Sequence, residues 1–134
     1  MSVIDHSPVL AASAKVVTPI GPAHGPIAPI VARSTDDLAV FADRFDDSIE
    51  VYSPDPVESL RLLAPFFADQ HVVLLFALDG DEHPDATLFV DGVTITAHLT
   101  GADHPSPFRP AHAVRHLVGF AVAERDLPAG YRLG

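Results

Sequence analysis

The sequence predicts an α+β domain in which helices pack mainly on one face of a small mixed or antiparallel sheet, preceded by an extended N-terminal arm. Three observations lead to this class. The first 33 residues carry five prolines, which exclude a long helix. Residues 71–78 form an unbroken apolar run, and the segments around it show apolar side chains at helical spacing. A chain of 134 residues supports one buried core. We therefore expect an arm over 1–33 and a single domain over 34–134.

The predicted arm is apolar rather than polar. It has no aromatic residue and three charged ones, whereas disordered tails are rich in charge and poor in β-branched residues. We expect it to make few contacts within its own chain and to lie extended on neighbouring subunits. A short edge strand over Ile27–Val31 is a further expectation, because an edge tolerates proline. The residues predicted to bind a partner are Val9, Leu10, Val16, Val17, Ile20, Ile27 and Ile30.

Two helices are predicted in the first half of the domain. Ser34 is a good N-cap for a helix over about 35–45, and Ile49–Tyr52 suggest a brief strand. Asp55 and Pro56 suit the start of a second helix, with Glu58 at the capping-box position. Pro65 removes a helical hydrogen bond, so this helix should kink or stop near Ala64.

The second half should contain a strand, a hairpin and a last helix. Residues 71–78 read as a strand buried on both faces. Residues 87–90 and 93–99 flank Asp91-Gly92, which favours a type I′ hairpin turn, and the second strand has one dry face. A helix over about 110–125 follows from the apolar stripe Val114, Leu117, Val118, Ala121 and Val122, with Gly119 roughly opposite. The predicted core residues are Leu60, Leu63, Phe67, Leu75, Phe76, Ile95, Leu117 and Val118.

These elements leave one surface without a cover. The strand over 71–78 is apolar on both faces, whereas the strand over 93–99 is apolar on one. If helices cover one face of the sheet, apolar side chains on the other still need burial. We expect the arm or a neighbouring subunit to provide it.

The charge of the chain limits its partners. The net charge is −10, and 15 of the 18 acidic residues lie between 34 and 103. An acidic surface repels phosphate backbones, so nucleic-acid binding is disfavoured. No stretch approaches the roughly 18 apolar residues of a membrane helix, and no signal-peptide pattern opens the chain. With no cysteine, these features predict a cytoplasmic or virion protein, without membrane insertion and not secreted by a cleaved signal peptide.

Two clusters have some of the features of a metal site. His112 and His116 have the i, i+4 spacing that zinc sites use, and His98, Asp103 or His104 could add a ligand. However, Arg115 would repel the cation, and position 113 lacks the glutamate of a zincin helix. The acidic loop 79–85 begins like an EF-hand, but Pro84 stands where glycine is needed and Val90 replaces the bidentate glutamate. We therefore expect no metal site.

Motifs for catalysis are also missing. The chain has no cysteine, no G-x-S-x-G nucleophile elbow and no glycine-rich phosphate loop. The sequence thus predicts no catalytic residue and no cofactor. It favours a non-enzymatic structural or accessory subunit of a larger protein assembly, either a phage virion component or a subunit of a bacterial complex. The alternatives are an acidic inhibitor or immunity-type binding protein, and a small metal- or ligand-binding domain built around His98, His104, His112 and His116.

Overall fold

The fold is mostly β. The computed structural model describes residues 9–22, 27–44, 56–80, 85–100 and 114–134. About half of these residues lie in strands and about a quarter in helical segments. The strands form two sheets, and one α-helix exceeds two turns. The expected α+β class, with helices packed on one small sheet, is therefore wrong.

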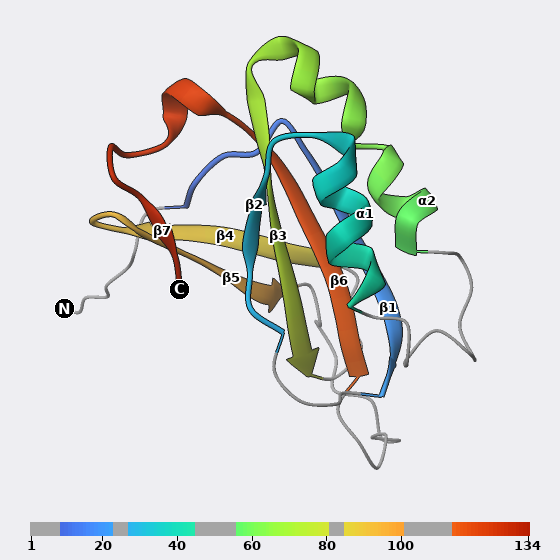
Figure 1. The fold of residues 1–134 in the computed structure, drawn as a ribbon. Helices are drawn as coiled ribbons and strands as arrows, with labels where there is room; N and C mark the ends of the chain where they lie inside the picture. Colours follow the sequence, from blue (N-terminus) through green and yellow to red (C-terminus); the bar gives the residue numbers. More distant parts are fainter. Residues whose placement is uncertain (1–8, 23–26, 45–55, 81–84, 101–113) are drawn as a thin grey trace, which may run out of the picture.

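A four-stranded antiparallel sheet lies at the centre of the molecule (Figure 1). Its order is β1 (Ala14–Pro22), β6 (Val114–Ala123), β3 (His71–Gly80) and β2 (Ile30–Ala32). β3 and β6 pair along their whole length, from His71 opposite Ala123 to Gly80 opposite Val114. β1 and β2 are the edge strands.

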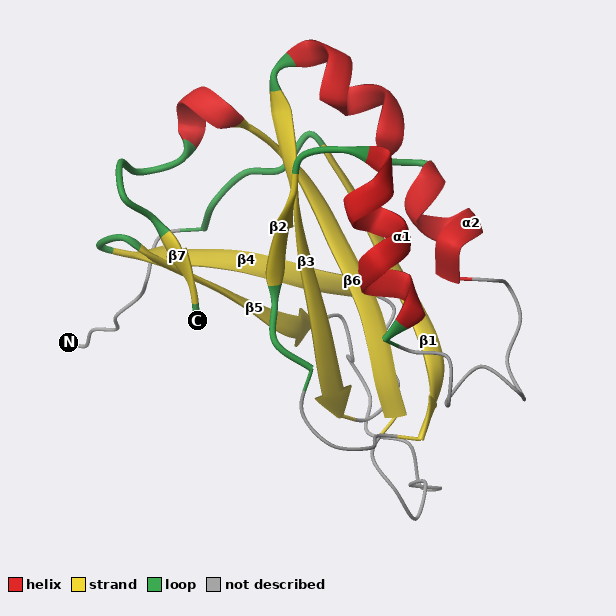
Figure 2. Cartoon of the chain, viewed as in Figure 1, coloured by secondary structure: helices red, strands yellow, loops and turns green. Residues whose placement is uncertain are grey.

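Both faces of the central sheet are covered by the chain itself (Figure 2). Short helical segments lie on one face: α1 (Thr35–Asp43), α2 (Pro56–Arg61) and a 3₁₀ helix (Ala64–Asp69). A second sheet lies on the other face, with β5 (Thr94–Thr100) between β4 (Asp85–Asp91) and the parallel β7 (Arg132–Leu133). A 3₁₀ turn (Glu124–Asp126) follows β6. The face expected to need an arm or a neighbour is thus buried by the second sheet.

Successive side chains of β3 and β6 point to opposite faces of the sheet and pack into two separate cores. Leu75 and Leu117 point into the core beneath the helices. Leu74 and Phe120 point into the core between the sheets, where Phe120 meets Phe76 edge to face. This arrangement confirms the strand predicted over 71–78 and its burial on both faces. Of the predicted core residues, Phe67 is partly buried and the others are buried: Leu60, Leu63, Leu75, Phe76, Ile95, Leu117 and Val118.

The helix predicted over 110–125 is wrong. Residues 114–123 form β6, and residues 101–113 lie outside the described part of the chain. The apolar stripe that suggested a helix is part of a segment that is apolar at nearly every position from Leu117 to Ala123. Such a segment suits a strand between two cores, because both of its faces are buried. Gly119, on the polar side of the predicted helix, lies in the core against Leu63.

The other local predictions are largely confirmed. Ser34 caps α1, because its hydroxyl accepts a hydrogen bond from the Asp37 amide at 3.4 Å. α2 ends at Arg61, and a 3₁₀ helix takes over at Ala64, as Pro65 requires. The strand suggested over Ile49–Tyr52 and the cap Asp55 lie outside the described residues. None of the described helices is long and apolar enough to span a membrane.

The hairpin β4–β5 forms with a small shift in its turn. Asp91 pairs with Thr94, so the loop residues are Gly92 and Val93 rather than Asp91 and Gly92. Gly92 has a φ of 63°, whereas Val93 does not have a positive φ. A type I′ turn needs positive φ at both central residues, so that expectation is wrong. The dry face of β5 is confirmed, because Ile95 and Ala97 are buried.

The N-terminal segment does not behave as a separate arm. It is extended as expected, but β1 pairs with β6 and β2 pairs with β3. The expectation of few contacts within the chain is therefore wrong for residues 14–22 and 30–32. The prolines are accommodated because β1 lies at an edge and carries a register shift between Pro19 and Gly21. The predicted edge strand near Ile27–Val31 is confirmed as β2.

Candidate functional site

The first described residues run along one side of both sheets. The Leu10 amide donates to the Leu88 carbonyl of β4 at 3.0 Å, and Val9 forms a bridge with Phe89. The Ser13 amide then donates to the Ala121 carbonyl of β6 at 2.8 Å, where β1 begins. We call residues 9–18 the N-terminal edge. It closes the gap between the two sheets on this side of the molecule.

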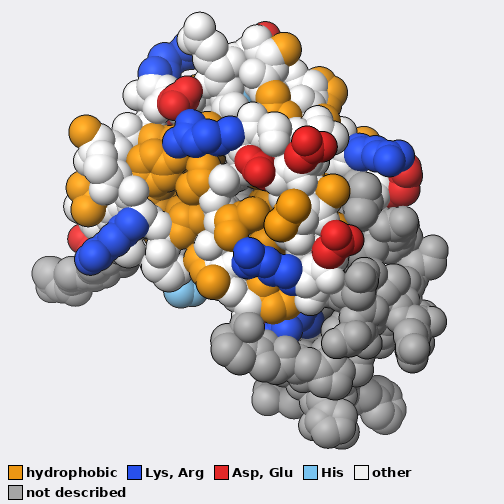
Figure 3. All heavy atoms as spheres, viewed as in Figure 1, with side chains coloured by type: hydrophobic (Ala, Val, Ile, Leu, Met, Phe, Trp, Pro, Cys, Tyr) orange, Lys and Arg blue, Asp and Glu red, His pale blue; other side chains and the backbone are white. Residues whose placement is uncertain are grey.

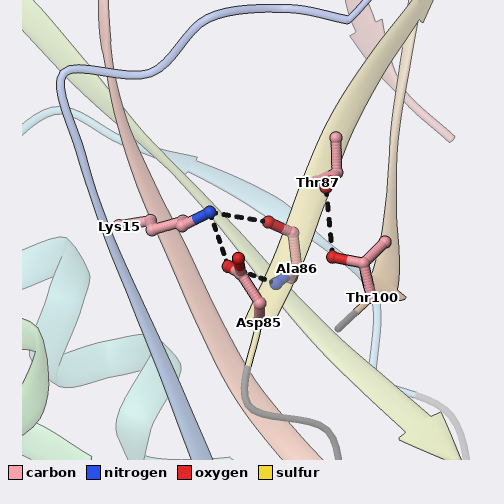
Figure 4. Close-up of polar contacts among 5 residues, drawn as sticks. All are labelled: Lys15, Asp85, Ala86, Thr87 and Thr100. Atoms are coloured by element: carbon pink, nitrogen blue, oxygen red, sulfur yellow. Dashed lines mark hydrogen bonds and ion pairs between the residues drawn. The ribbon is translucent and has the colours of Figure 1, made fainter. Parts of the chain in front are cut away.

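Lys15 ties the two sheets together across this edge (Figure 4). Its Nζ atom lies 2.5 Å from Asp85 Oδ1 and donates to the Ala86 carbonyl at 3.2 Å. The Ala86 amide donates to the same carboxylate at 2.8 Å. The hydrogen bond from Lys15 is the main reason that the pKa of Asp85 lies below its usual value of 3.8; the Ala86 amide adds to this lowering and burial opposes it. Both side chains are nearly half exposed, so Lys15 and Asp85 form a surface ion pair rather than a buried one.

A side-chain hydrogen bond joins the N-terminal edge to the start of β3. Ser13 Oγ lies 2.8 Å from Nε2 of His71, whose Nδ1 lies 2.8 Å from the Asp69 carbonyl. A carbonyl only accepts, so Nδ1 carries a proton and Nε2 of the neutral ring accepts from Ser13. The contact fastens the edge to the domain.

This serine and histidine do not make a case for nucleophilic catalysis. A nucleophile also needs hydrogen-bond donors that stabilise the oxyanion of the reaction. The amide of Ser13 itself is occupied by the Ala121 carbonyl. The ring centroids of Phe66 and His71 are 5.3 Å apart, so the His71 ring is packed against a neighbouring side chain. We assign the pair a structural role.

A shallow groove of about 410 Å³ lies beside the N-terminal edge. One wall is the edge itself, over residues 9–15, and the opposite wall is β4 with Phe120 beneath. Most of the lining is apolar, and Lys15 contributes a charged side chain. The lining residues are Val9, Leu10, Ala11, Ala12, Ser13, Ala14, Lys15, Ala86, Thr87, Leu88 and Phe120.

A buried arginine lies at the far end of β3 and β6 and pairs with an exposed carboxylate. Arg115 donates to both carboxylate oxygens of Asp79, at 2.8 and 2.9 Å, and the two residues are directly opposite in the sheet. The Arg115 side chain is 4% exposed and that of Asp79 is 37% exposed. The neighbouring His116 is buried, with Nδ1 at 3.3 Å from the Leu78 carbonyl. This bidentate pair joins the ends of β3 and β6 and gives the buried Arg115 the partner that its burial requires.

Most of the predicted partner-binding side chains take part in the chain's own packing. Leu10 and Val17 pack against the core between the sheets. Val16, Ile27 and Ile30 pack against the core beneath the helices. Val9 is 63% exposed, and the side chain of Ile20 lies outside the described set. Their role toward a partner stays a prediction. Among the described atoms of this segment, the Val9 side chain is exposed and the outer main chain of β1 has no partner strand.

The candidate metal ligands are not brought together within the described part of the chain. His98 lies exposed on β5 against the Phe89 ring, while His116 is buried on β6. Asp103, His104 and His112 lie outside the described residues. No group of three histidine, aspartate or glutamate side chains in the described ranges is placed to hold a metal ion.

Sequence reasoning missed two ion pairs, one at the N-terminal edge and one at the far end of β3 and β6. Lys15 and Asp85 are 70 residues apart, and Asp79 and Arg115 are 36 apart. No local sequence pattern predicts such pairs, because their residues are brought together only by the order of the strands in the sheets. Comparison of the chain with models of protein families, with curated proteins and with solved structures gives no match.

Proposed function

We propose that this chain is a non-enzymatic structural or accessory subunit of a larger protein assembly, in the cytoplasm or in a virion. In this proposal it contacts neighbouring subunits through the N-terminal edge. The observation that carries it is the outer edge of β1. No described strand pairs with that edge, and the exposed Val9 and the shallow groove lie beside it.

An unpaired edge strand is a binding element in its own right. It presents a row of main-chain donors and acceptors that an extended segment of another protein can complete. The adjoining groove offers apolar surface for a side chain of the added strand. This proposal changes the prediction of an arm that lies on a neighbour. The segment pairs with β6 of its own chain, and the outer edge of β1 contacts the partner.

The inhibitor alternative receives less support. It needs acidic side chains gathered on one exposed face. On the face shown in Figure 3, acidic and basic side chains are interspersed. Several acidic residues of the described surface already pair with a base, as Glu58 does with Arg61 and Glu124 with Arg33. A basic target would have to displace these partners.

Site-specific photocrosslinking tests the proposal. A photoreactive residue replaces Val9 on the N-terminal edge, and the matched control replaces Val93, which is 42% exposed in the β4–β5 turn. Crosslinking is done in the native source. The partner protein found in the crosslinked product is then purified, and its binding to the wild-type chain is measured. We expect a defined partner from position 9 and none from position 93. A native particle of only 14.2 kDa, with no crosslink from position 9, would refute the proposal.

A further inference from the structure

The outer edge of β4 is covered by the chain itself. β5 pairs with the other side of β4 along the whole strand. On the outer side, the Ala86 carbonyl accepts from Lys15 Nζ and the Ala86 amide donates to the carboxylate of Asp85 (Figure 4). Two residues further on, the Leu88 carbonyl accepts from the Leu10 amide. Proteins cover sheet edges in this way because an open edge is a template for pairing with another chain.

Residues 9–12, here called the N-terminal strap, lie on this edge like a short added strand. Val9 and Phe89 face each other across an antiparallel bridge, and the Leu10 side chain packs against the core between the sheets. In strand addition, main-chain hydrogen bonds supply affinity and pockets for alternate side chains supply specificity. The strap therefore shows what the edge accepts, which is an extended, uncharged segment with an aliphatic side chain at the position of Leu10.

The strap is held less firmly than the strand that follows it. Within the described part of the chain, its one main-chain hydrogen bond is the bond to β4, and Val9, Ala11 and Ala12 are exposed. The shallow groove lies between the strap and β4, so the two are not closely packed there. From Ser13 onward, by contrast, the chain is hydrogen-bonded to β6. The strap can therefore detach while β1 stays in its sheet.

We propose that the strap is an autoinhibitory contact, which occupies a strand-binding site on the outer edge of β4 until an extended, uncharged aliphatic segment of a partner protein displaces it. The occupant is inferred from the segment of this chain that is seated on the edge. Because the site is open only when the strap is detached, the partner's apparent dissociation constant is the intrinsic one divided by the open fraction. This inference concerns β4 rather than the outer edge of β1, so it goes beyond the proposed function and does not rest on it.

Residue-resolved amide exchange of the full-length chain tests whether the strap opens by itself. The Leu10 amide is bonded to β4, and the Ser13 amide at the base of the strap is bonded to β6. If the strap detaches locally, the Leu10 amide should exchange about tenfold or more faster than the Ser13 amide. Equal protection of the two amides would show that the strap opens only together with β1, which overturns the proposal.

A titration with a synthetic peptide tests the occupant. The probe is the uncharged, end-capped peptide Val-Leu-Ala-Ala-Ser-Ala, which has the sequence of residues 9–14, and nuclear magnetic resonance follows the amides of β4 in the full-length chain. Leu10→Ser weakens the strap and raises the open fraction, so it should tighten peptide binding about tenfold. Leu62→Ser is the matched control, because Leu62 is 71% exposed and lies away from β4 in the turn after α2; it should leave the affinity unchanged. A peptide that carries Leu10→Asp should not bind.

A disulfide that locks the strap gives a second, independent test. The hydrogen bond from Leu10 to Leu88 joins the residues next to Val9 and Phe89. Val9 and Phe89 are thus a non-hydrogen-bonded antiparallel pair, whose side chains lie close together. The double variant Val9→Cys with Phe89→Cys should therefore form a disulfide, and the chain has no other cysteine. The oxidised form should lose peptide binding and the reduced form of the same protein should regain it. Circular dichroism melting checks that both forms are folded.

Each remaining outcome overturns the inference. Peptide binding that persists in the oxidised protein would place the peptide at another edge. Equal affinity of the wild type and Leu10→Ser would show that the strap does not compete, and no binding to any form would show that β4 is not a site for such a segment. Dimers formed by the reduced protein, with the Leu10 amide protected, would show that copies exchange straps instead of binding a different partner. The lock leaves the outer edge of β1 unchanged, so the proposed function can fail or stand independently in its own crosslinking test.

Discussion

Replacing Gly119 by alanine tests the central feature of the fold, because the expected sign depends on whether residues 114–123 form a strand or a helix. A methyl group at this position would lie 2.8 Å from Leu63 Cδ1 and 3.2 Å from Leu60 Cδ2 and Leu75 Cδ2. Carbon atoms pack favourably at about 3.5–4.0 Å, so all three leucines must give way. All three are fully buried.

The magnitude follows from two opposing effects. Adding a methyl group to a packed core usually costs about 1–3 kcal/mol. Alanine also restricts the unfolded chain, which favours folding by about 0.4–1 kcal/mol. We therefore expect Gly119→Ala to lower the free energy of unfolding by about 1–2 kcal/mol. On the exposed face of a helix the same change would stabilise the protein by up to about 1 kcal/mol, because alanine is the better helix former.

Urea unfolding measures this difference through the midpoint, provided that the slope is unchanged. Leu63→Ala is a second variant in this experiment, since it removes the side chain nearest the new methyl group. Alone it should cost about 2–5 kcal/mol. Combined with Gly119→Ala, the total loss should be smaller than the sum by about 1 kcal/mol, because the methyl group fills part of the cavity. A stabilising Gly119→Ala, or strict additivity of the two changes, would refute the packing described for β6.

Further expectations concern the core, the ion pair, the N-terminus and metal. Leu117→Ala should cost about 2–5 kcal/mol in the same assay; a loss under about 0.5 kcal/mol would contradict its burial. Lys15→Met should cost less than about 1 kcal/mol at neutral pH. The lowered pKa of Asp85 means that the ion pair stabilises the fold above pH 3.8 and is lost as the pH falls through the folded-state pKa. The difference between wild type and Lys15→Met should thus disappear in acid, and a difference that grows there would be inconsistent with this tie. Deleting residues 2–30 should abolish cooperative thermal unfolding, because it removes β1; a truncated chain that melts like the full one would show that the edge is dispensable. Elemental analysis should find no stoichiometric transition metal, and one zinc per chain that is lost in His112→Ala would overturn this.

Local signals predicted the elements whose burial is one-sided or whose ends are capped. Ser34 and Pro56 mark the starts of two helices, and both start where expected. The turn at Gly92 marks the hairpin, although the loop is one residue later than predicted. In each case the information lies within a few residues of the feature, so tertiary packing did not need to be known.

The segment over 114–123 was misread because burial on both faces removes the periodicity that distinguishes a strand from a helix. Two residues carried a usable signal. Phe120 is a large apolar side chain away from the predicted helical stripe, and Gly119 is a poor helix former in the middle of the segment. The segment 71–78 has the same all-apolar character, and the two become partners in the centre of the sheet.

The prolines of the N-terminal segment correctly excluded a helix, yet they did not distinguish a free arm from an edge strand. Proline is compatible with both, because an edge strand leaves one row of main-chain groups unpaired. The β-branched side chains favoured burial, and the sequence could not say against which surface. In the structure Val16 and Val17 are partly buried and pack against opposite cores of their own chain. The apolar character that suggested a partner is thus largely satisfied within the molecule.

Folding and binding therefore draw on different atoms of the same segment. Ala14, Val16 and Val17 of β1 pack against the two cores, and the inner main-chain groups of the strand pair with β6. Its outer main-chain groups and the exposed Val9 serve the proposed contacts. A deletion removes both sets at once and would lose binding through unfolding. A probe at Val9 addresses only the second set, so a loss of contact in that experiment can be assigned to the interface itself.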